Sequence, residues 1–359
     1  MAKRKREDHQ LRICNPSCGL APDSSSGGEV HERELLKALS PLADVHLLIS
    51  PRKRVPTQVR SVREPLWPPR GLRWWVTPWT VPLAIARCVR AHRPGIIRAH
   101  SIRGMGLACL IAGRRVSLPV LAHVHHLDGG RLAWLDRFIL QRVDAVTTDS
   151  EFSAGQVRRI APGQHVISIP CGVGPEFCPD GQAPHPLVLF LGGLKPRKNV
   201  EFLLRVWRRV RVPGAQLVIA GNGPEFPRLQ AMATDMPTVG FRTDFDDRVK
   251  VALYQRAMVF AFPSLLEGFG MPPLEAQACG VPAIVSQSGS LPEVVQHGLT
   301  GYVLPLHEGT WADALESLLT DATGRGAMGG AAAHWARSFT WERTAHETVV
   351  AAQRLSGGR

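Results

Sequence analysis

The chain has 359 residues, of which 44% are hydrophobic and 20% charged, and its lysines and arginines exceed its acidic residues by 13. This length predicts two domains, and this composition supplies enough apolar side chains for two cores, which excludes a disordered or low-complexity protein. The chain has no apolar run of about eighteen residues, so no transmembrane helix is expected. The net charge of +13 indicates an anionic partner: a nucleic acid, an anionic membrane face or a phosphorylated ligand.

The N-terminus carries the basic run Lys3–Arg6 with no apolar stretch behind it, so we do not expect a secretory signal. The run fits a nuclear address or a nucleic-acid-binding arm, but a solvated terminus is the simpler interpretation. The seven cysteines show no paired spacing beyond Cys14 and Cys18, and no second pair completes a zinc site. Reduced thiols predict a cytoplasmic protein, with the inner face of the membrane as an alternative location.

Strands and helices alternate through the first half of the sequence. Strands are expected at 11–14, 45–49, 94–100, 119–124 and 145–148, and helices at 29–39, 81–91, 107–112 and 131–142. Ser150 suits the N-cap of a further helix. This order is typical of a doubly wound α/β domain. Gly27 and Gly28, at the start of the first helix, would let a phosphate approach the backbone, although a plain turn explains them equally well.

The segment from Pro51 to Pro82 has no clear periodicity and is interpreted as irregular. It holds Trp67, Trp74, Trp75 and Trp79 among arginines and prolines. These aromatic side chains can pack on their own domain. They can also form an acceptor surface or, over residues 60–82, a contact with an anionic membrane, because tryptophan is stable at an interface and arginine pairs with lipid phosphates.

Three histidines lie at the end of the predicted strand 119–124: His123, His125 and His126. Ligands of doubly wound domains bind at the carboxyl ends of the strands, which is where His125 falls. Alternate histidines also ligate zinc in some enzymes, but a zinc site needs acidic co-ligands that the sequence does not place here. No metal is therefore expected.

The segment 174–186 is rich in proline and glycine and predicts a linker, so the second domain begins with a buried strand at 187–191. Gly192 to Asn199 follow, and then a predicted helix at 200–210. Arg197 and Lys198 stand at the start of that helix, where cations and exposed amides can bind a diphosphate and stabilise a leaving group. A solvated pair of basic residues is the alternative.

Between the predicted strands 257–262 and 283–285 lie a glycine-rich loop, Glu267 to Gly270, and a helix from about Pro272 to Cys279. Glu267 is expected on the loop and Glu275 in the first turn of the helix, so both can face one crevice. Carboxylates accept hydrogen bonds from ribose and sugar hydroxyls, while a helix start binds phosphate. The alternative is that Glu275 complements the helix dipole and Glu267 is merely solvated.

The pattern Glu-Gly-Phe-Gly-x-Pro-x-Leu-Glu-Ala-x-Ala-x-Gly-x-Pro, which begins at Glu267, closely resembles the donor-site signature of the family 4 retaining glycosyltransferases. The resemblance extends over nearly the whole chain. It implies a GT-B fold, an α/β architecture of two doubly wound Rossmann-like domains that face each other across a cleft. The domains would be 1–173 and 187–338, joined by the linker 174–186, with a terminal helix at 339–359 that crosses back to the first domain.

The resemblance also implies roles for single residues. Lys198 would bind the diphosphate, and Arg197 would carry the charge of an arginine that the family usually has where this chain has Gly193. Glu267 would bind or polarise the transferred sugar, and His125 would orient it. Glu275 would hold the ribose. The other expected nucleotide-sugar contacts are Gly27, Gly28, Gly193, Phe241, Gly268, Phe269, Gly270, Met271 and Leu274.

The activity implied is the retaining transfer of a sugar from a GDP- or UDP-linked donor to a hydroxyl acceptor, such as a glycan or a lipid-linked saccharide. No metal or other cofactor is expected. The segment Leu-x-Pro-Arg-Lys-Asn, from Leu194, resembles mannosyltransferases, so mannose is the expected sugar. The alternatives are a nucleotide-sugar epimerase or hydrolase of the same architecture, or a basic nucleic-acid-binding protein, although nucleic acid is not the expected partner.

Overall fold

The computed structural model describes residues 11–17, 20, 27–49, 61–63, 73–127, 133–182 and 184–357. The chain forms two compact units: one holds the residues up to Gly172 together with those from Trp341 onward, and the other holds Val173–Thr340. The sequence interpretations of Lys3–Arg6, Cys18 and Trp67, and of the Trp74 and Trp75 side chains, fall outside what is described. Within the described ranges, no helix has both the length and the apolar character needed to cross a bilayer.

The first unit is built on a seven-stranded sheet in the order β3-β2-β1-β4-β5-β6-β7. Every described pairing in it is parallel. Parallel strands need a crossover connection, and a helix usually supplies it. The strands are β1 (Arg12–Pro16), β2 (Asp44–Ile49), β3 (Ser61–Arg63), β4 (Ile96–Ala99), β5 (Val120–Val124), β6 (Ala145–Thr148) and β7 (Val166–Ser168).

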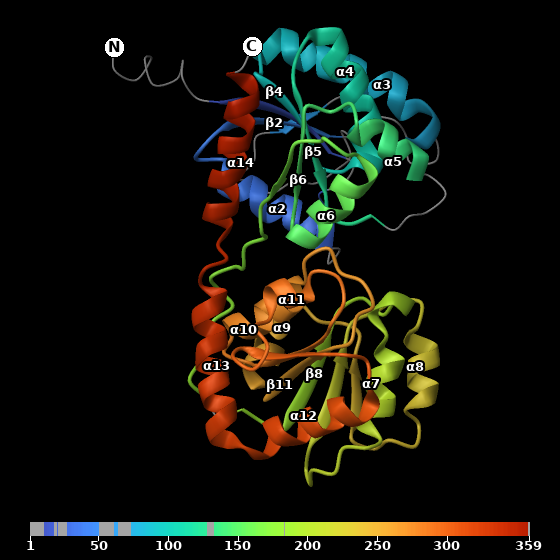
Figure 1. Cartoon of the computed structure of the whole chain (residues 1–359), viewed down its shortest axis with the longest axis vertical. Coiled ribbons are helices and arrows are strands. Elements are labelled where there is room, and N and C mark those ends of the chain that lie inside the picture. Colours follow the sequence, from blue (N-terminus) through green and yellow to red (C-terminus); the bar gives the residue numbers. More distant parts are fainter. Residues whose placement is uncertain are drawn as a thin grey trace. The chain divides into compact units, whose positions relative to one another are not determined.

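Helices cover both faces of this sheet. Helix α2 packs against the C-terminal helix α14, and α3 packs against α4. Figure 1 shows β4, β5 and β6 between these two groups. Apolar side chains such as Ile85, Ile97 and Cys109 fill one of the interfaces. The helices are α2 (Gly27–Leu39), α3 (Arg73–His92), a π-helical turn (Ile102–Gly106), α4 (Leu107–Val116), α5 (Ala133–Leu140), α6 (Glu151–Ile160) and α14 (Trp341–Ser356).

The second unit repeats the design with a six-stranded sheet in the order β10-β9-β8-β11-β12-β13, and its described pairings are again parallel. In both units the strand order reverses beside the first strand, at β1/β4 and at β8/β11. Doubly wound sheets bind ligands at such switch points. The strands are β8 (Leu187–Leu191), β9 (Gln216–Ala220), β10 (Val239–Arg242), β11 (Val259–Phe262), β12 (Ala283–Ser286) and β13 (Gly301–Leu304).

The helices of the second unit also flank its sheet (Figure 1). Phe202 and Trp311 pack edge to face where α7 meets α12, and Trp311 is fully buried. The helices are a 3₁₀ turn (Pro196–Lys198), α7 (Val200–Trp207), α8 (Phe226–Met232), α9 (Asp247–Arg256), α10 (Met271–Ala278), α11 (Leu291–Val294), α12 (Glu308–Thr320) and α13 (Ala322–Ala336).

Two local predictions were wrong. The segment interpreted as irregular up to Pro82 is helical from Arg73, since α3 accommodates both Pro78 and Pro82. The Thr80 hydroxyl donates to the carbonyl of Val76, inside the turn that Pro78 interrupts. Glu275 lies in the second turn of α10 and not in its first, because the helix begins one residue earlier than predicted, at Met271.

Candidate active site

The carboxyl ends of β8 and β11 carry the residues that the sequence analysis placed around a diphosphate. These strands are parallel neighbours, with Val259 opposite Val188, so the loops that follow them lie side by side. The amide of Leu265, after β11, donates to the carbonyl of Arg197, after β8 (2.8 Å). The sheet order alone therefore brings together two loops that are almost seventy residues apart in sequence.

Lys198 and Glu267 form a buried ion pair where these two loops meet. Lys198 Nζ donates to Glu267 Oε1 (2.6 Å), and each side chain is only 9% exposed. The Ser264 hydroxyl donates to the same oxygen. Arg197 Nη1 donates to Glu267 Oε2 (3.3 Å) and to the carbonyl of Leu266 (2.9 Å). One carboxylate therefore fixes two cations at the switch point of the sheet.

Burial and charge act in opposite directions on the pKa values of this pair. Burial alone would raise the pKa of Glu267, but the charges of Lys198 and Arg197 hold it below its ordinary value. The pKa of Lys198 is lowered, because its burial outweighs the attraction of Glu267. A bound anion would favour the charged form of Lys198. The pair of cations, Lys198 and Arg197, is therefore suited to bind a phosphate.

Three successive amides lie at the start of α10. Pro272 and Pro273 have no N–H, so the donors available to an anion are the amides of Phe269, Gly270 and Met271. Across the described part of the chain, none of the three donates a hydrogen bond to a backbone carbonyl. The Ser290 hydroxyl donates to the carbonyl of Phe269 (2.7 Å), which holds this loop in place. These amides supply partial positive charge close to the Glu267 loop.

Glu275 is buried in α10, and both of its oxygens are bound. Lys250 Nζ donates to Oε1 (2.6 Å), and the Tyr254 hydroxyl donates to Oε2 (2.8 Å). A ribose that took this carboxylate as its acceptor would therefore have to compete with Lys250 or Tyr254.

The other predicted donor-site residues of this unit have mixed surroundings. Leu274 is fully buried and supports α10 from within. The Phe241 ring is half-buried and packs edge to face on Phe226. Gly193 is exposed in the loop after β8, and Gly268 is half-buried in the loop after β11.

In the first unit, the predicted residues Gly28 and His125 lie close together. A Cβ placed on Gly28 would lie 3.3 Å from His125 Nε2, so a larger residue at this position would push the imidazole away. Gly27 is exposed at the start of the same helix. The two segments meet because α2 begins, and β5 ends, at the same edge of the parallel sheet.

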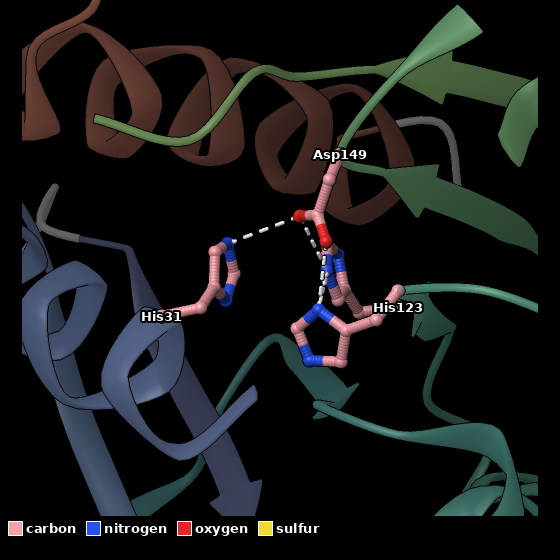
Figure 2. Close-up of side chains that lie close together, drawn as sticks. His31, His123 and Asp149 are labelled. Carbon is pink, nitrogen blue, oxygen red and sulfur yellow. Dashed lines mark hydrogen bonds and ion pairs between the residues drawn. The ribbon is translucent and has the colours of Figure 1, made fainter. Parts of the chain in front are cut away.

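Two functional candidates, His31 and Asp149, were not recognised from the sequence. Asp149 Oδ2 lies 2.7 Å from His125 Nδ1, while Asp149 Oδ1 lies 3.0 Å from His123 Nε2 and 3.4 Å from His31 Nε2. Figure 2 shows His31 and His123 turned toward the Asp149 carboxylate. The sequence held part of the signal, because Asp149 follows the predicted strand 145–148 just as His125 follows the predicted strand 119–124, but the pairing of these two strands comes from the structure.

The charges in this cluster depend on one another. Burial would raise the pKa of Asp149, but the three imidazoles hold it well below its ordinary value. Burial would lower the pKa of His125, but the Asp149 carboxylate raises it on balance. For His31 and His123 burial prevails, so both pKa values are lowered. Burial also raises the pKa of the neighbouring Cys171 thiol, and the charge of Asp149 adds to this effect.

Two family models match the chain and together span most of it. The model described as "Glycosyltransferase Family 4" matches residues 25–177, and "Glycosyl transferases group 1" matches residues 181–335. The chain is 31% identical over 314 residues to the GDP-mannose-dependent alpha-(1-6)-phosphatidylinositol monomannoside mannosyltransferase of Mycolicibacterium smegmatis. That alignment covers 78% of this chain and 81% of the relative.

Solved structures show the same fold at lower identity. Sucrose-phosphate synthase from Thermosynechococcus elongatus superposes with a TM-score of 0.80 at 21% identity, covering 98% of this chain and 100% of that one. Anabaena Alr3699/HepE in complex with UDP and glucose superposes with a TM-score of 0.81 at 17% identity, covering 96% and 100% of the two chains.

Proposed function

The chain belongs to glycosyltransferase family 4 and has the GT-B fold, and from that premise we propose that it transfers mannose from GDP-mannose to a lipid-linked hydroxyl acceptor, with retention at the anomeric carbon. The observation that carries the proposal is the cationic corner of Lys198 and Arg197, which Glu267 fixes at the switch point of the second sheet. The mannosyl donor rests on the mycobacterial relative, whose name specifies GDP-mannose.

Lys198, Arg197 and the amides of Phe269, Gly270 and Met271 are proposed to bind the diphosphate. Their positive charge compensates the negative charge that develops on the departing phosphate, so we propose no metal ion at the diphosphate. The Glu267 carboxylate would then lie beside the transferred sugar and accept hydrogen bonds from its hydroxyls.

In the proposed reaction the bond from the anomeric carbon to the phosphate oxygen breaks, and the acceptor oxygen bonds to that carbon on the same face. The acceptor proton passes to the departing phosphate oxygen, so the products are a glycoside and a nucleoside diphosphate. No separate general base is required. Glu275 is proposed to bind the ribose by exchanging Lys250 or Tyr254 for a hydroxyl. His125 is proposed to orient the sugar through Nε2, the nitrogen that faces Gly28.

We also propose that the first unit contacts the anionic inner face of the membrane. Trp79 and Leu83 are one turn apart on α3, with exposed fractions of 70% and 51%. Trp134 and Phe138 form a similar pair on α5, where the Arg142 guanidinium lies 4.1 Å above the Phe138 ring. Exposed aromatic side chains beside arginine are suited to the headgroup region of a bilayer.

The transfer proposal is tested with the purified full chain, a panel of GDP- and UDP-linked sugars, and mannosylated lipid acceptors. We expect nucleoside diphosphate release that requires the acceptor, a glycoside with the anomeric configuration of the donor by NMR, and loss of both in Lys198→Ala. Lys195→Ala, a change at an exposed lysine of the same loop, is the matched control. Sugar release or epimerisation without an acceptor would contradict the proposal.

Membrane contact is tested by co-sedimentation with vesicles that contain phosphatidylinositol and phosphatidylglycerol. We expect binding at low salt that weakens in the double variant Trp79→Ser, Trp134→Ser. Equal recovery of both proteins in the supernatant would contradict this part of the proposal.

A further inference from the structure

Three of the four side chains in the polar cluster around His125 are almost sealed from solvent, and His125 itself is 22% exposed. The cluster comprises His31 from α2, His123 and His125 from the end of β5, and Asp149 from the end of β6. The side chains of His31, His123 and Asp149 are 2–4% exposed. Four groups that could each hold a proton or a metal ion are thus gathered in a small buried volume, with one ligand atom of each within 4.8 Å of all the others.

The distances between these atoms match the edges of a metal coordination sphere. A tetrahedral ion with bonds of about 2.0–2.1 Å separates neighbouring ligand atoms by about 3.3–3.4 Å. Asp149 Oδ1 lies 3.4 Å from His31 Nε2 and 3.0 Å from His123 Nε2, and His123 Nε2 lies 3.3 Å from His125 Nδ1. Three of the six edges of a four-ligand site are therefore close to their required lengths, and the other three are no longer than 4.8 Å.

The hydrogen bonds of the cluster leave a place for a cation between His123 and Asp149. The Thr147 hydroxyl donates to the carbonyl of Ala122, so its oxygen accepts from His123 Nδ1–H (3.0 Å). A neutral His123 then presents a bare Nε2 lone pair to Asp149 Oδ1 at 3.0 Å. Within the described part of the chain, Asp149 Oδ1 accepts no aligned hydrogen bond, and His31 Nδ1 is also buried without one. An imidazole nitrogen and a carboxylate oxygen this close in a buried site have a positive charge between them, which a proton or a metal ion supplies, and the metal titration below tells the two apart.

We propose that His31, His123, His125 and Asp149 bind one divalent transition-metal ion of the zinc class. Three imidazoles and one carboxylate form a set that suits Zn²⁺ and its neighbours, whereas Mg²⁺ and Ca²⁺ need mainly oxygen ligands. The hydrogen bond from His123 to Thr147 is the outer contact that orients a metal-bound imidazole. All four proposed ligands belong to the first unit, whereas Lys198, Arg197 and the start of α10 belong to the second.

The ion would also fix the tautomer of His125. A metal on Nδ1 leaves the hydrogen of a neutral imidazole on Nε2, the nitrogen beside Gly28. His125 would then be a permanent donor toward whatever binds at the start of α2. This consequence rests on the proposed function, whereas metal binding itself does not.

The test uses untagged full-length protein that has been stripped with a chelator and titrated with Co²⁺ and then Zn²⁺. We expect about one tightly bound ion per chain by elemental analysis, visible d–d absorption of the intensity typical of four-coordinate Co²⁺, and loss of that absorption when Zn²⁺ displaces it. We also expect a rise in the thermal midpoint on adding Zn²⁺, because a ligand that binds only the folded state stabilises it. None of these measurements requires glycosyl transfer.

His31→Gln and Asp149→Asn should each lower Co²⁺ affinity by ~100-fold or more and remove the d–d absorption. His92→Gln is the matched control, since His92 stacks on His46 elsewhere in the unit and should leave metal binding intact. A wild-type protein that binds no Co²⁺ or Zn²⁺ would overturn the proposal, as would absorption that survives in His31→Gln and Asp149→Asn. If both variants unfold, the Co²⁺ spectrum and metal content of the wild type decide the question.

Discussion

The buried pair Lys198–Glu267 predicts that stability and transfer can be separated by two substitutions. Lys198→Met leaves the Glu267 carboxylate, 9% exposed, without its main partner. Removing one member of a buried pair costs about 3–5 kcal/mol. We expect the lower limit, because Arg197 and the Ser264 hydroxyl still bind the carboxylate. A loss of about 3 kcal/mol corresponds to a thermal midpoint lowered by roughly 6–12 °C in a unit of this size.

Adding Glu267→Gln to Lys198→Met removes both charges. The double variant should recover most of the lost stability, because it leaves no unpaired charge buried. Transfer should stay at least ~100-fold below wild type in both variants, because no cation replaces Lys198 at the diphosphate. The assays are differential scanning fluorimetry and release of nucleoside diphosphate, with Lys195→Met as the control. If the double variant regained transfer, Lys198 would act only by neutralising Glu267, and the catalytic role would be refuted.

Three further predictions concern the same unit. Gly289→Ala should lower both the thermal midpoint and transfer, since at φ +61° its new Cβ would lie 2.5 Å from the carbonyl oxygen of Glu267. Gly298→Ala, equally strained at φ +77° but without neighbours, should leave transfer unchanged. Glu267→Gln should lower the midpoint at pH 7 but not in strong acid. The folded-state pKa of Glu267 is below its ordinary value of 4.5, so the stability from its charge is present above 4.5 and is lost as the pH falls through the folded-state pKa. Tyr254→Phe removes one hydrogen-bond donor from Glu275 and should change the KM for the nucleotide sugar by ~10-fold, with little change in kcat. An unchanged KM would contradict ribose binding by Glu275.

The doubly wound architecture could be predicted from sequence because each element has a strong local signal. Buried runs such as Leu187–Leu191 predict strands of a parallel sheet, and Ser150 does cap α6, accepting from the amide of Ser153. Helix α3 was missed in part because Pro78 and Pro82 favour an irregular segment, whereas packing against α4 keeps the chain helical. In this helix the tertiary contacts outweighed the local preference.

The same contrast holds for the sites. Lys198 and Glu267 were chosen separately by motif, and the adjacency of β8 and β11 explains why they meet. The cluster of His31 and Asp149 cannot be found from sequence motifs alone. It requires the register of β5 and β6, where Val124 lies opposite Thr148, so that the residues just beyond each strand become neighbours. Single-residue patterns do not contain that register.

The proposed transfer depends most on diphosphate binding at the corner formed by Lys198, Arg197 and the start of α10. Isothermal titration of GDP against guanosine, on the wild type and on Lys198→Ala, tests it directly. We expect GDP to bind the wild type at least ~100-fold more tightly than guanosine, since two charge-assisted hydrogen bonds contribute about 3 kcal/mol or more, and we expect most of this preference to vanish in Lys198→Ala. Equal affinity for the two ligands, or a preference unchanged in Lys198→Ala, would contradict diphosphate binding at this corner.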